Sequence, residues 1–155
     1  MSVKPIPEGY HSITPYLVIK GAKEALSFYQ EAFSAQVMLV LNMPDGNVAH
    51  AEMTIGNSPF MLSEECDEEG FDSPLTLGGS ATSMMVYTED VDILFQQAVD
   101  VGCEIIRPVQ DQFYGDRTGT LKDPFGHIWV LATHKEDLTE EQLNQRMADF
   151  IASQA

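Results

Sequence analysis

The sequence has 155 residues, 44% hydrophobic and 21% charged, a composition typical of one globular domain or of two half-size modules. Eight Lys and Arg residues stand against 24 Asp and Glu residues, and the formal net charge of −16 repels nucleic-acid phosphates and anionic lipid headgroups. No apolar run approaches the roughly 18 residues of a membrane span, and no hydrophobic signal core is evident. We therefore expect a cytoplasmic protein whose partners include neither nucleic acid nor a membrane.

The first half of the chain predicts the element order β-α-β-β-β. Apolar residues alternate from Ser12 to Ile19 as in a half-buried strand, and after Gly21 they recur at helical spacing as far as Phe33. Three more strand-like runs follow, over residues 35–43, 47–55 and 58–63. The dipeptides Asp45-Gly46 and Gly56-Asn57, which favour tight turns, separate them.

The second half repeats this order. A strand over residues 82–88 precedes Asp90, a good helix N-cap, and a helical stripe then runs to Gly102. Three strands are predicted over residues 103–109, 117–123 and 127–134. The pattern predicts an α+β domain over residues 5–135, made of two tandem βαβββ modules at residues 10–65 and 80–135.

Residues 136–155 are predicted to form an additional amphipathic helix. Thr139 and Gln142 have the spacing of a capping box, and an apolar stripe follows at Leu143, Met147, Phe150 and Ile151. This stripe either packs on its own domain or forms a dimer contact.

Six carboxylates lie between Glu64 and Asp72, with a spacing that does not match the alternating oxygen ligands of an EF-hand. A solvated, mobile loop is therefore favoured over a calcium loop. The two cysteines, Cys66 and Cys103, form no CxxC or Cys/His spacing, so both are expected to be reduced thiols.

Four segments of the chain carry a family resemblance. TPYLV (14–18), ALSFYQEAF (25–33) and HAEMTIG (50–56) resemble the opening strand, first helix and third strand of the PhnB-like branch of the vicinal-oxygen-chelate superfamily. DQFYGDRTGTLKDPFGHIW (111–129) resembles the closing signature of that branch. The superfamily includes glyoxalase I, bleomycin-resistance proteins and extradiol dioxygenases.

The resemblance implies that each module curls its mixed sheet into a cup with the helices outside. It also implies a homodimer, with a small-molecule ligand, and a metal in some members, held in the concave face. The positions that carry metal ligands in those members correspond to Thr14, Met61, Ser83 and Val130. None of the four is a good ligand for a divalent ion, so we expect no metal cofactor at these positions.

A relocated metal site is the alternative. His50 and Glu52 are two residues apart on one predicted strand and therefore point to the same face. A third ligand from His11 or His134 would complete a set suited to zinc or ferrous iron. Without a metal, His50 and Glu52 form a hydrogen-bonded pair in a ligand cavity, which is the interpretation we favour.

Strand alternation and the loop before the seventh strand together predict the ligand-binding residues. Arg117 either pairs with an anionic group of a ligand or forms a salt bridge with Asp116 or Glu52. Trp129 is expected to pack beneath a helix, because it alternates with Val130. The predicted ligand-binding set is Thr14, Tyr16, His50, Glu52, Ser83, Met85, Phe113, Tyr114 and Arg117.

Three functions compete on this basis. The first is a metal-free small-molecule-binding protein, for which the net charge favours a cationic ligand. The second is a lyase, isomerase or dioxygenase with a metal at His50 and Glu52. The third is an interaction module that uses the C-terminal helix. We expect the first.

Overall fold

The computed structural model describes residues 2–155. Its elements, in chain order, are β1 (Tyr16–Ile19), α1 (Ala22–Phe33), β2 (Gln36–Asn42), β3 (Val48–Ile55), β4 (Ser58–Glu64), the 3-10 turn η1 (Asp67–Glu69), α2 (Pro74–Leu77), β5 (Ser83–Tyr87), α3 (Val91–Asp100), β6 (Glu104–Asp111), β7 (Asp116–Lys122), β8 (Ile128–His134) and α4 (Glu140–Ser153).

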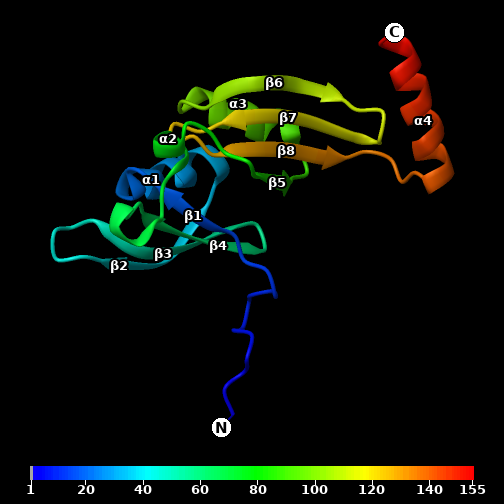
Figure 1. The fold of residues 1–155 in the computed structure, drawn as a ribbon. Helices are drawn as coiled ribbons and strands as arrows, with labels where there is room; N and C mark the ends of the chain where they lie inside the picture. Colours follow the sequence, from blue (N-terminus) through cyan, green and yellow to red (C-terminus); the bar gives the residue numbers. More distant parts are fainter. Residues whose placement is uncertain (1) are drawn as a thin grey trace. The chain divides into compact units, whose positions relative to one another are not determined.

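The strands form two sheets of the same topology, with orders β1-β4-β3-β2 and β5-β8-β7-β6 (Figure 1). In each sheet the first strand pairs in parallel with the last, and the other neighbours are antiparallel. This confirms the predicted α+β fold with its βαβββ repeat. β1 is shorter than predicted and begins only after Pro15, which has no N–H for a strand ladder.

The chain divides into two compact units. The N-terminal unit holds the first sheet, and the C-terminal unit holds the second sheet together with α4. Residues 124–127, in the connection between β7 and β8, pack with the N-terminal unit. There the ring of Phe125 meets that of Phe28 edge-on at 5.7 Å, and His127 Nε2 lies 3.0 Å from the carbonyl oxygen of Val18.

One helix covers one face of each sheet. In the N-terminal unit Ala25 and Tyr29 of α1 pack over Met53 and Leu62, and all four are fully buried. Burial of a side chain the size of Leu or Met contributes roughly 1.5–3 kcal/mol. We call the opposite, uncovered face of each sheet its open face.

α3 covers the second sheet in the same way. A Cβ atom on Gly119 of β7 would lie 2.5 Å from the ring of Phe95 on α3, so only glycine permits this approach of helix and strand. Trp129 is buried on the covered face, and its indole N–H donates to Asp123 at 2.9 Å. Its burial agrees with the predicted packing beneath a helix.

The acidic segment is solvated at its centre, where Asp67, Glu68 and Glu69 are exposed, but it also contains local structure. Cys66 and Phe71 pair as an isolated bridge around η1, and Ser73 caps α2. The Glu65 carboxylate accepts hydrogen bonds from the Ser73 N–H at 3.0 Å and the Thr76 hydroxyl at 2.7 Å. The segment is therefore folded around specific carboxylate contacts, which charge density in the sequence does not reveal.

α4 forms the predicted capping box: Thr139 Oγ1 accepts the Gln142 N–H at 3.2 Å, and Gln142 Oε1 accepts the Thr139 N–H at 2.9 Å. Although α4 is 14 residues long, none of its residues is buried. It lies beyond the carboxyl end of β8 (Figure 1, red). Its contacts with the C-terminal unit include a stacked pair of rings, Phe150 on Phe113, with centroids 5.0 Å apart.

Candidate functional site

The open face of the N-terminal sheet brings together the predicted residues of the first module. Tyr16 of β1 lies opposite Met61 of β4, which lies opposite Glu52 of β3. On the other side of β3, strand β2 places Leu39 opposite Glu52 and Leu41 opposite His50. Directly paired residues point to the same side of a sheet, so these side chains share one face. Thr14 is half-buried and precedes β1 by two residues.

Three of these side chains and one unpredicted tyrosine form a continuous hydrogen-bonded network. Tyr16 Oη lies 2.9 Å from His50 Nδ1, and His50 Nε2 lies 3.2 Å from Glu52 Oε1. The other carboxylate oxygen of Glu52 accepts a hydrogen bond from the Tyr10 hydroxyl. We call Tyr10, Glu52, His50 and Tyr16 the N-terminal polar network.

The network holds Glu52 as a carboxylate. The hydrogen bond from Tyr10, followed by the one from His50, lowers the pKa of Glu52. The same Glu52 hydrogen bond raises the pKa of Tyr10 to about 12. Tyr10 therefore remains a neutral donor, and Glu52 remains an anion, throughout the physiological pH range.

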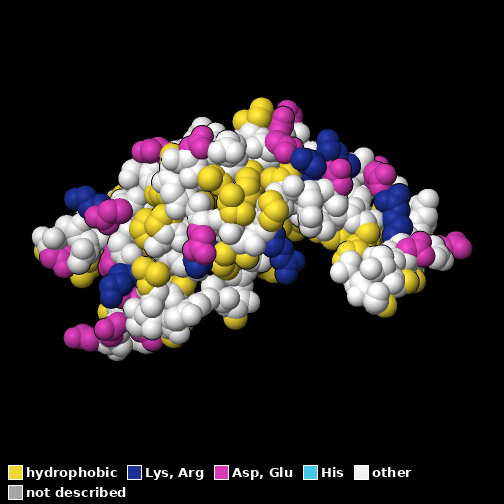
Figure 2. All heavy atoms as spheres, turned by 90° about the horizontal axis from the view of Figure 1, so that it is seen from above, with side chains coloured by type: hydrophobic (Ala, Val, Ile, Leu, Met, Phe, Trp, Pro, Cys, Tyr) yellow, Lys and Arg dark blue, Asp and Glu magenta, His cyan; other side chains and the backbone are white. Residues whose placement is uncertain are grey.

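Exposed apolar side chains of β2 border this network. Leu39 and Leu41, which lie opposite Glu52 and His50, expose 41% and 51% of their surfaces, respectively. On the face seen in Figure 2, the acidic side chains are scattered among apolar and uncharged ones. A polar network bordered by apolar surface is the usual composition of a small-molecule site.

The relocated metal site lacks its third ligand in this structure. His50 and Glu52 form the pair expected for the metal-free interpretation, and their remaining close partners are two tyrosines. His134, one of the two suggested third ligands, is bonded to Asp116 and Asp137 within the C-terminal unit. Over residues 2–155, no group of three or more His, Cys, Asp or Glu side chains is arranged to hold a metal ion.

The open face of the C-terminal sheet carries two more predicted residues, Ser83 and Met85, both exposed. They alternate with half-buried residues of β5 and face the same way as Tyr87. The Tyr87 hydroxyl donates to Asp116 Oδ2 at 3.0 Å, and His134 Nδ1 lies 2.6 Å from Asp116 Oδ1. This buried carboxylate therefore anchors a second polar network.

His134 links that network to the tail. Its Nε2 lies 2.9 Å from Asp137 Oδ1, beyond the end of β8. Hydrogen bonds to Asp137 and then to Asp116 raise the pKa of His134. A protonated His134 thus bridges the last strand and the segment that leads into α4.

Phe113 and Tyr114 lie in the loop between β6 and β7 and contact each other edge-on at 5.3 Å. Phe113 also stacks on Phe150, and its carbonyl oxygen accepts a hydrogen bond from Arg146 at 3.3 Å. In this structure α4 therefore packs against the loop between β6 and β7.

Arg117 does not share the open face with Ser83 and Met85. It pairs with Thr133, whose side chain points to the covered face, where its hydroxyl accepts the Val91 N–H. The guanidinium donates twice to Asp92 of α3, both at 2.8 Å, and once to Asp111 at 3.2 Å. The salt-bridge alternative is therefore the one observed, with Asp92 and Asp111 as partners in place of Asp116 or Glu52.

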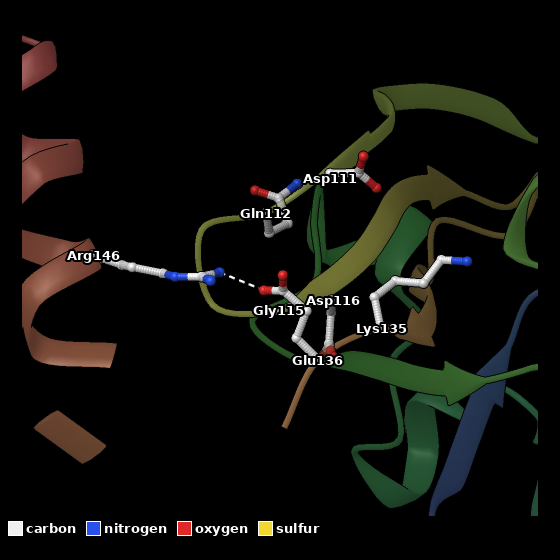
Figure 3. Close-up of a pocket in the computed structure, with 7 residues that line it drawn as sticks. All are labelled: Asp111, Gln112, Gly115, Asp116, Lys135, Glu136 and Arg146. Carbon is white, nitrogen blue, oxygen red and sulfur yellow. Dashed lines mark hydrogen bonds and ion pairs between the residues drawn. The ribbon is translucent and has the colours of Figure 1, made fainter. Parts of the chain in front are cut away.

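A cavity of about 360 Å³ lies beneath α4, between the β6–β7 loop and the segment that leads to the helix (Figure 3). Arg146 of α4 points toward Glu136, and both residues line this cavity (Figure 3). A Cβ atom on Gly115 would lie 2.7 Å from the carbonyl oxygen of Glu136, so glycine lets the tail pass this loop closely. The lining is Asp111, Gln112, Gly115, Asp116, Lys135, Glu136 and Arg146.

Sequence reasoning missed Tyr10 and the anchoring role of Asp116. Tyr10 precedes the first strand, so strand alternation assigns it no face. The sequence suggests Asp116 only as a salt-bridge partner for Arg117. In the structure the side chains of Asp116 and Arg117 point to opposite faces of β7. The signal in the sequence for this role is that an acidic residue, Asp116, occupies a β7 position whose side chain faces the open face of the sheet.

Comparisons with known proteins agree on one family. A family model described as the Glyoxalase/Bleomycin resistance protein/Dioxygenase superfamily matches residues 10–131. An uncharacterized protein of Mycobacterium bovis is 31% identical over 141 residues, which cover 88% of this chain and 92% of that protein.

Solved structures share the fold. A PhnB protein from Bacillus cereus superposes with a TM-score of 0.62 at 24% identity, covering 79% of this chain and 99% of that one. TioX from Micromonospora sp. ML1 superposes with a TM-score of 0.63 at 22% identity, covering 83% and 100%. None of the helices in the described part of the chain is long and apolar enough to cross a membrane.

Proposed function

The chain belongs to the Glyoxalase/Bleomycin resistance protein/Dioxygenase superfamily, and from this premise we propose that it is a small-molecule-binding protein whose ligand lies on the open face of the N-terminal sheet. The observation that carries the proposal is the N-terminal polar network beside the exposed apolar side chains Leu39 and Leu41. One fold in this family serves many chemistries, so function depends on the side chains of the site and not on the fold.

The network favours a ligand that donates hydrogen bonds. Glu52 is an anion, and with His50 neutral the hydrogens of Tyr10, Tyr16 and His50 are all directed along the network toward it. The lone pairs that remain are acceptors, mainly on the exposed oxygen of Tyr16. An aromatic or aliphatic ligand with an ammonium or N–H group would match both the acceptors and the surrounding Leu39 and Leu41.

The ligand needs no metal in this proposal. His50 and Glu52 make their hydrogen bonds to each other and to the two tyrosines, so they position a ligand without an ion. Metal-dependent lyase, isomerase or dioxygenase chemistry at His50 and Glu52 is the competing function. It predicts stoichiometric zinc or iron after incubation of the purified protein, and loss of that metal in His50→Ala.

The test compares three probes that share a phenyl ring and differ in the head group: 2-phenylethylamine, 2-phenylethanol and 3-phenylpropionate. Titration calorimetry should rank the amine tightest and the carboxylate weakest. Glu52→Gln should remove most of the difference between amine and alcohol, whereas Lys23→Gln on α1 should leave the ranking unchanged. Equal binding of all three probes, or a preference for the carboxylate, would contradict the proposal.

We also propose a cytoplasmic homodimer in which α4 contacts a second copy of the chain. Helices of about 12–15 residues are marginal in water, and α4 buries none of its residues in its own chain. Its apolar side chains Met147, Phe150 and Ile151 remain about half exposed. A contact with another molecule would supply the burial that the chain itself does not.

A further inference from the structure

Tyr16, His50 and Glu52 form a line of a hydroxyl, an imidazole and a carboxylate joined by hydrogen bonds. An ionised carboxylate only accepts hydrogen bonds, so His50 Nε2 carries the hydrogen that points to Glu52 Oε1 at 3.2 Å. In the neutral ring Nδ1 then accepts, and Tyr16 donates to it at 2.9 Å. The hydrogen bonds therefore run from Tyr16 through His50 to Glu52.

Access to solvent decreases along this line. Tyr16 is 49% exposed, while the side chains of His50 and Glu52 are 25% and 23% exposed. A ligand on the open face therefore meets the phenol first, with the imidazole behind it. Tyr10 holds the far oxygen of Glu52, which fixes the carboxylate in place. An exposed hydroxyl backed by an oriented imidazole is the arrangement that general acid–base catalysis requires.

We propose that Tyr16 is a proton-transfer group that, with His50 as its relay, interconverts the keto and enol forms of a 1,3-dicarbonyl ligand. The inference rests on the proposed function, because it places its substrate at the same site on the open face of the N-terminal sheet. Before proton transfer the relay consists of a phenol, a neutral imidazole and the Glu52 anion, so it offers no positive charge to an enolate oxygen. The substrate must therefore spread the charge itself, and an enolate shared between two carbonyl oxygens does so.

The step balances without a further reactant. The Tyr16 oxygen takes the proton from the carbon between the two carbonyls as the Tyr16 proton passes to His50 Nδ1, and the C–H electron pair becomes the enolate. His50 is then a cation beside the Glu52 anion. Return of one proton through Tyr16 to a carbonyl oxygen gives the enol and restores neutral His50.

The probe is 1-phenyl-1,3-butanedione, a neutral aromatic 1,3-dicarbonyl. Deuterium uptake at its central carbon, followed by proton NMR in D₂O, should be faster with the protein than in buffer. Proton transfer by a positioned side chain contributes about 100-fold to 10,000-fold. Tyr16→Phe should lose most of this acceleration, and His50→Gln should lose a comparable part. Lys23→Gln, on the covered side of the sheet, should keep it.

Two further measurements separate the possible failures. Calorimetry with the same probe tests binding alone: binding without acceleration overturns the inference and leaves the proposed function intact. No binding also overturns the inference, and the titration of the three phenyl probes then decides the proposed function separately. Nitrogen-15 NMR of His50 tests the relay without any ligand. A neutral ring protonated at Nε2 is expected, and a neutral ring protonated at Nδ1 would overturn the relay.

Discussion

The carboxylate of Glu64, the last residue of β4, accepts the backbone N–H of Ala22, the first residue of α1, at 2.7 Å. Its second oxygen accepts the N–H of Gly21 at 3.0 Å. α1 has no side-chain cap of its own, because its N-cap residue is Gly21 in a left-handed conformation. A residue 42 positions away along the chain thus caps the helix that covers the N-terminal sheet.

Glu64→Gln should therefore destabilise the protein by about 1 kcal/mol, in the range measured for losing a helix N-cap. The negative charge at the positive end of the helix dipole is lost, while a weaker amide acceptor remains. Denaturant unfolding measures the change. Glu68→Gln, which alters an exposed carboxylate in the same acidic segment, should leave the stability almost unchanged. Equal effects of the two substitutions would contradict the capping role.

Glu65 should make stability depend on pH in acid. Hydrogen bonds from Ser73 and Thr76 lower the pKa of Glu65 to about 2, against about 4.3 for an unperturbed glutamate. A lowered carboxylate pKa stabilises the fold fully above about pH 4.3, and this contribution is lost as the pH falls through about 2. The stability difference between wild type and Glu65→Gln should therefore shrink between pH 5 and pH 2. A difference that is constant over that range would argue against these hydrogen bonds.

Tyr10→Phe should return the pKa of Glu52 toward its usual value. The Tyr10 hydroxyl is the largest cause of the lowered pKa, and phenylalanine keeps the ring while removing this donor. Carbon-13 NMR titration of the Glu52 carboxyl group measures the shift. Tyr16→Phe removes a phenol that contacts His50 but not Glu52, so it should change the pKa of Glu52 less. The reverse order would show that Tyr10 does not hold Glu52.

His134 should titrate above the usual histidine range, because Asp137 and then Asp116 favour its protonated form. A raised histidine pKa stabilises the fold fully below about pH 6.5, and this contribution is lost as the pH rises through the folded-state pKa. Asp137→Asn should lower the pKa of His134 in an NMR titration. Asp149→Asn on α4 removes a carboxylate that Gln145 contacts, and it should leave His134 unchanged.

Removal of residues 138–155 should lower the oligomeric state measured by sedimentation while the fold of both sheets is kept. Met147→Glu tests the same contact in the full-length chain, because it places a charge within the apolar stripe of α4. Gln145→Glu adds the same charge on the opposite side of the helix and should have no effect. An unchanged sedimentation coefficient for both the truncation and Met147→Glu would exclude α4 as the dimer contact.

The sequence by itself determined the order of the two βαβββ modules and the face of the strands in the first module. Alternation and helical spacing repeat within a few residues, so Leu17 and Ile19 could be assigned to the covered face and Tyr16 to the open face without any knowledge of packing. The pairing of His50 with Glu52 followed from the same local rule, because residues two apart on a strand share a side. The capping box of α4 is also local, since it spans only the four residues from Thr139 to Gln142, and it formed as predicted.

Only the tertiary structure decided which distant groups meet. The hydrogen bond between Tyr10 and Glu52, the cap that Glu64 places on α1 and the choice of Asp92 by Arg117 join residues 42, 42 and 25 positions apart. Such contacts depend on how the helices and strands pack in three dimensions. Because the chain has 24 Asp and Glu residues, several carboxylates satisfy any local rule equally well. The N-terminal polar network thus required the fold, although three of its members, Tyr16, His50 and Glu52, could be named from the sequence.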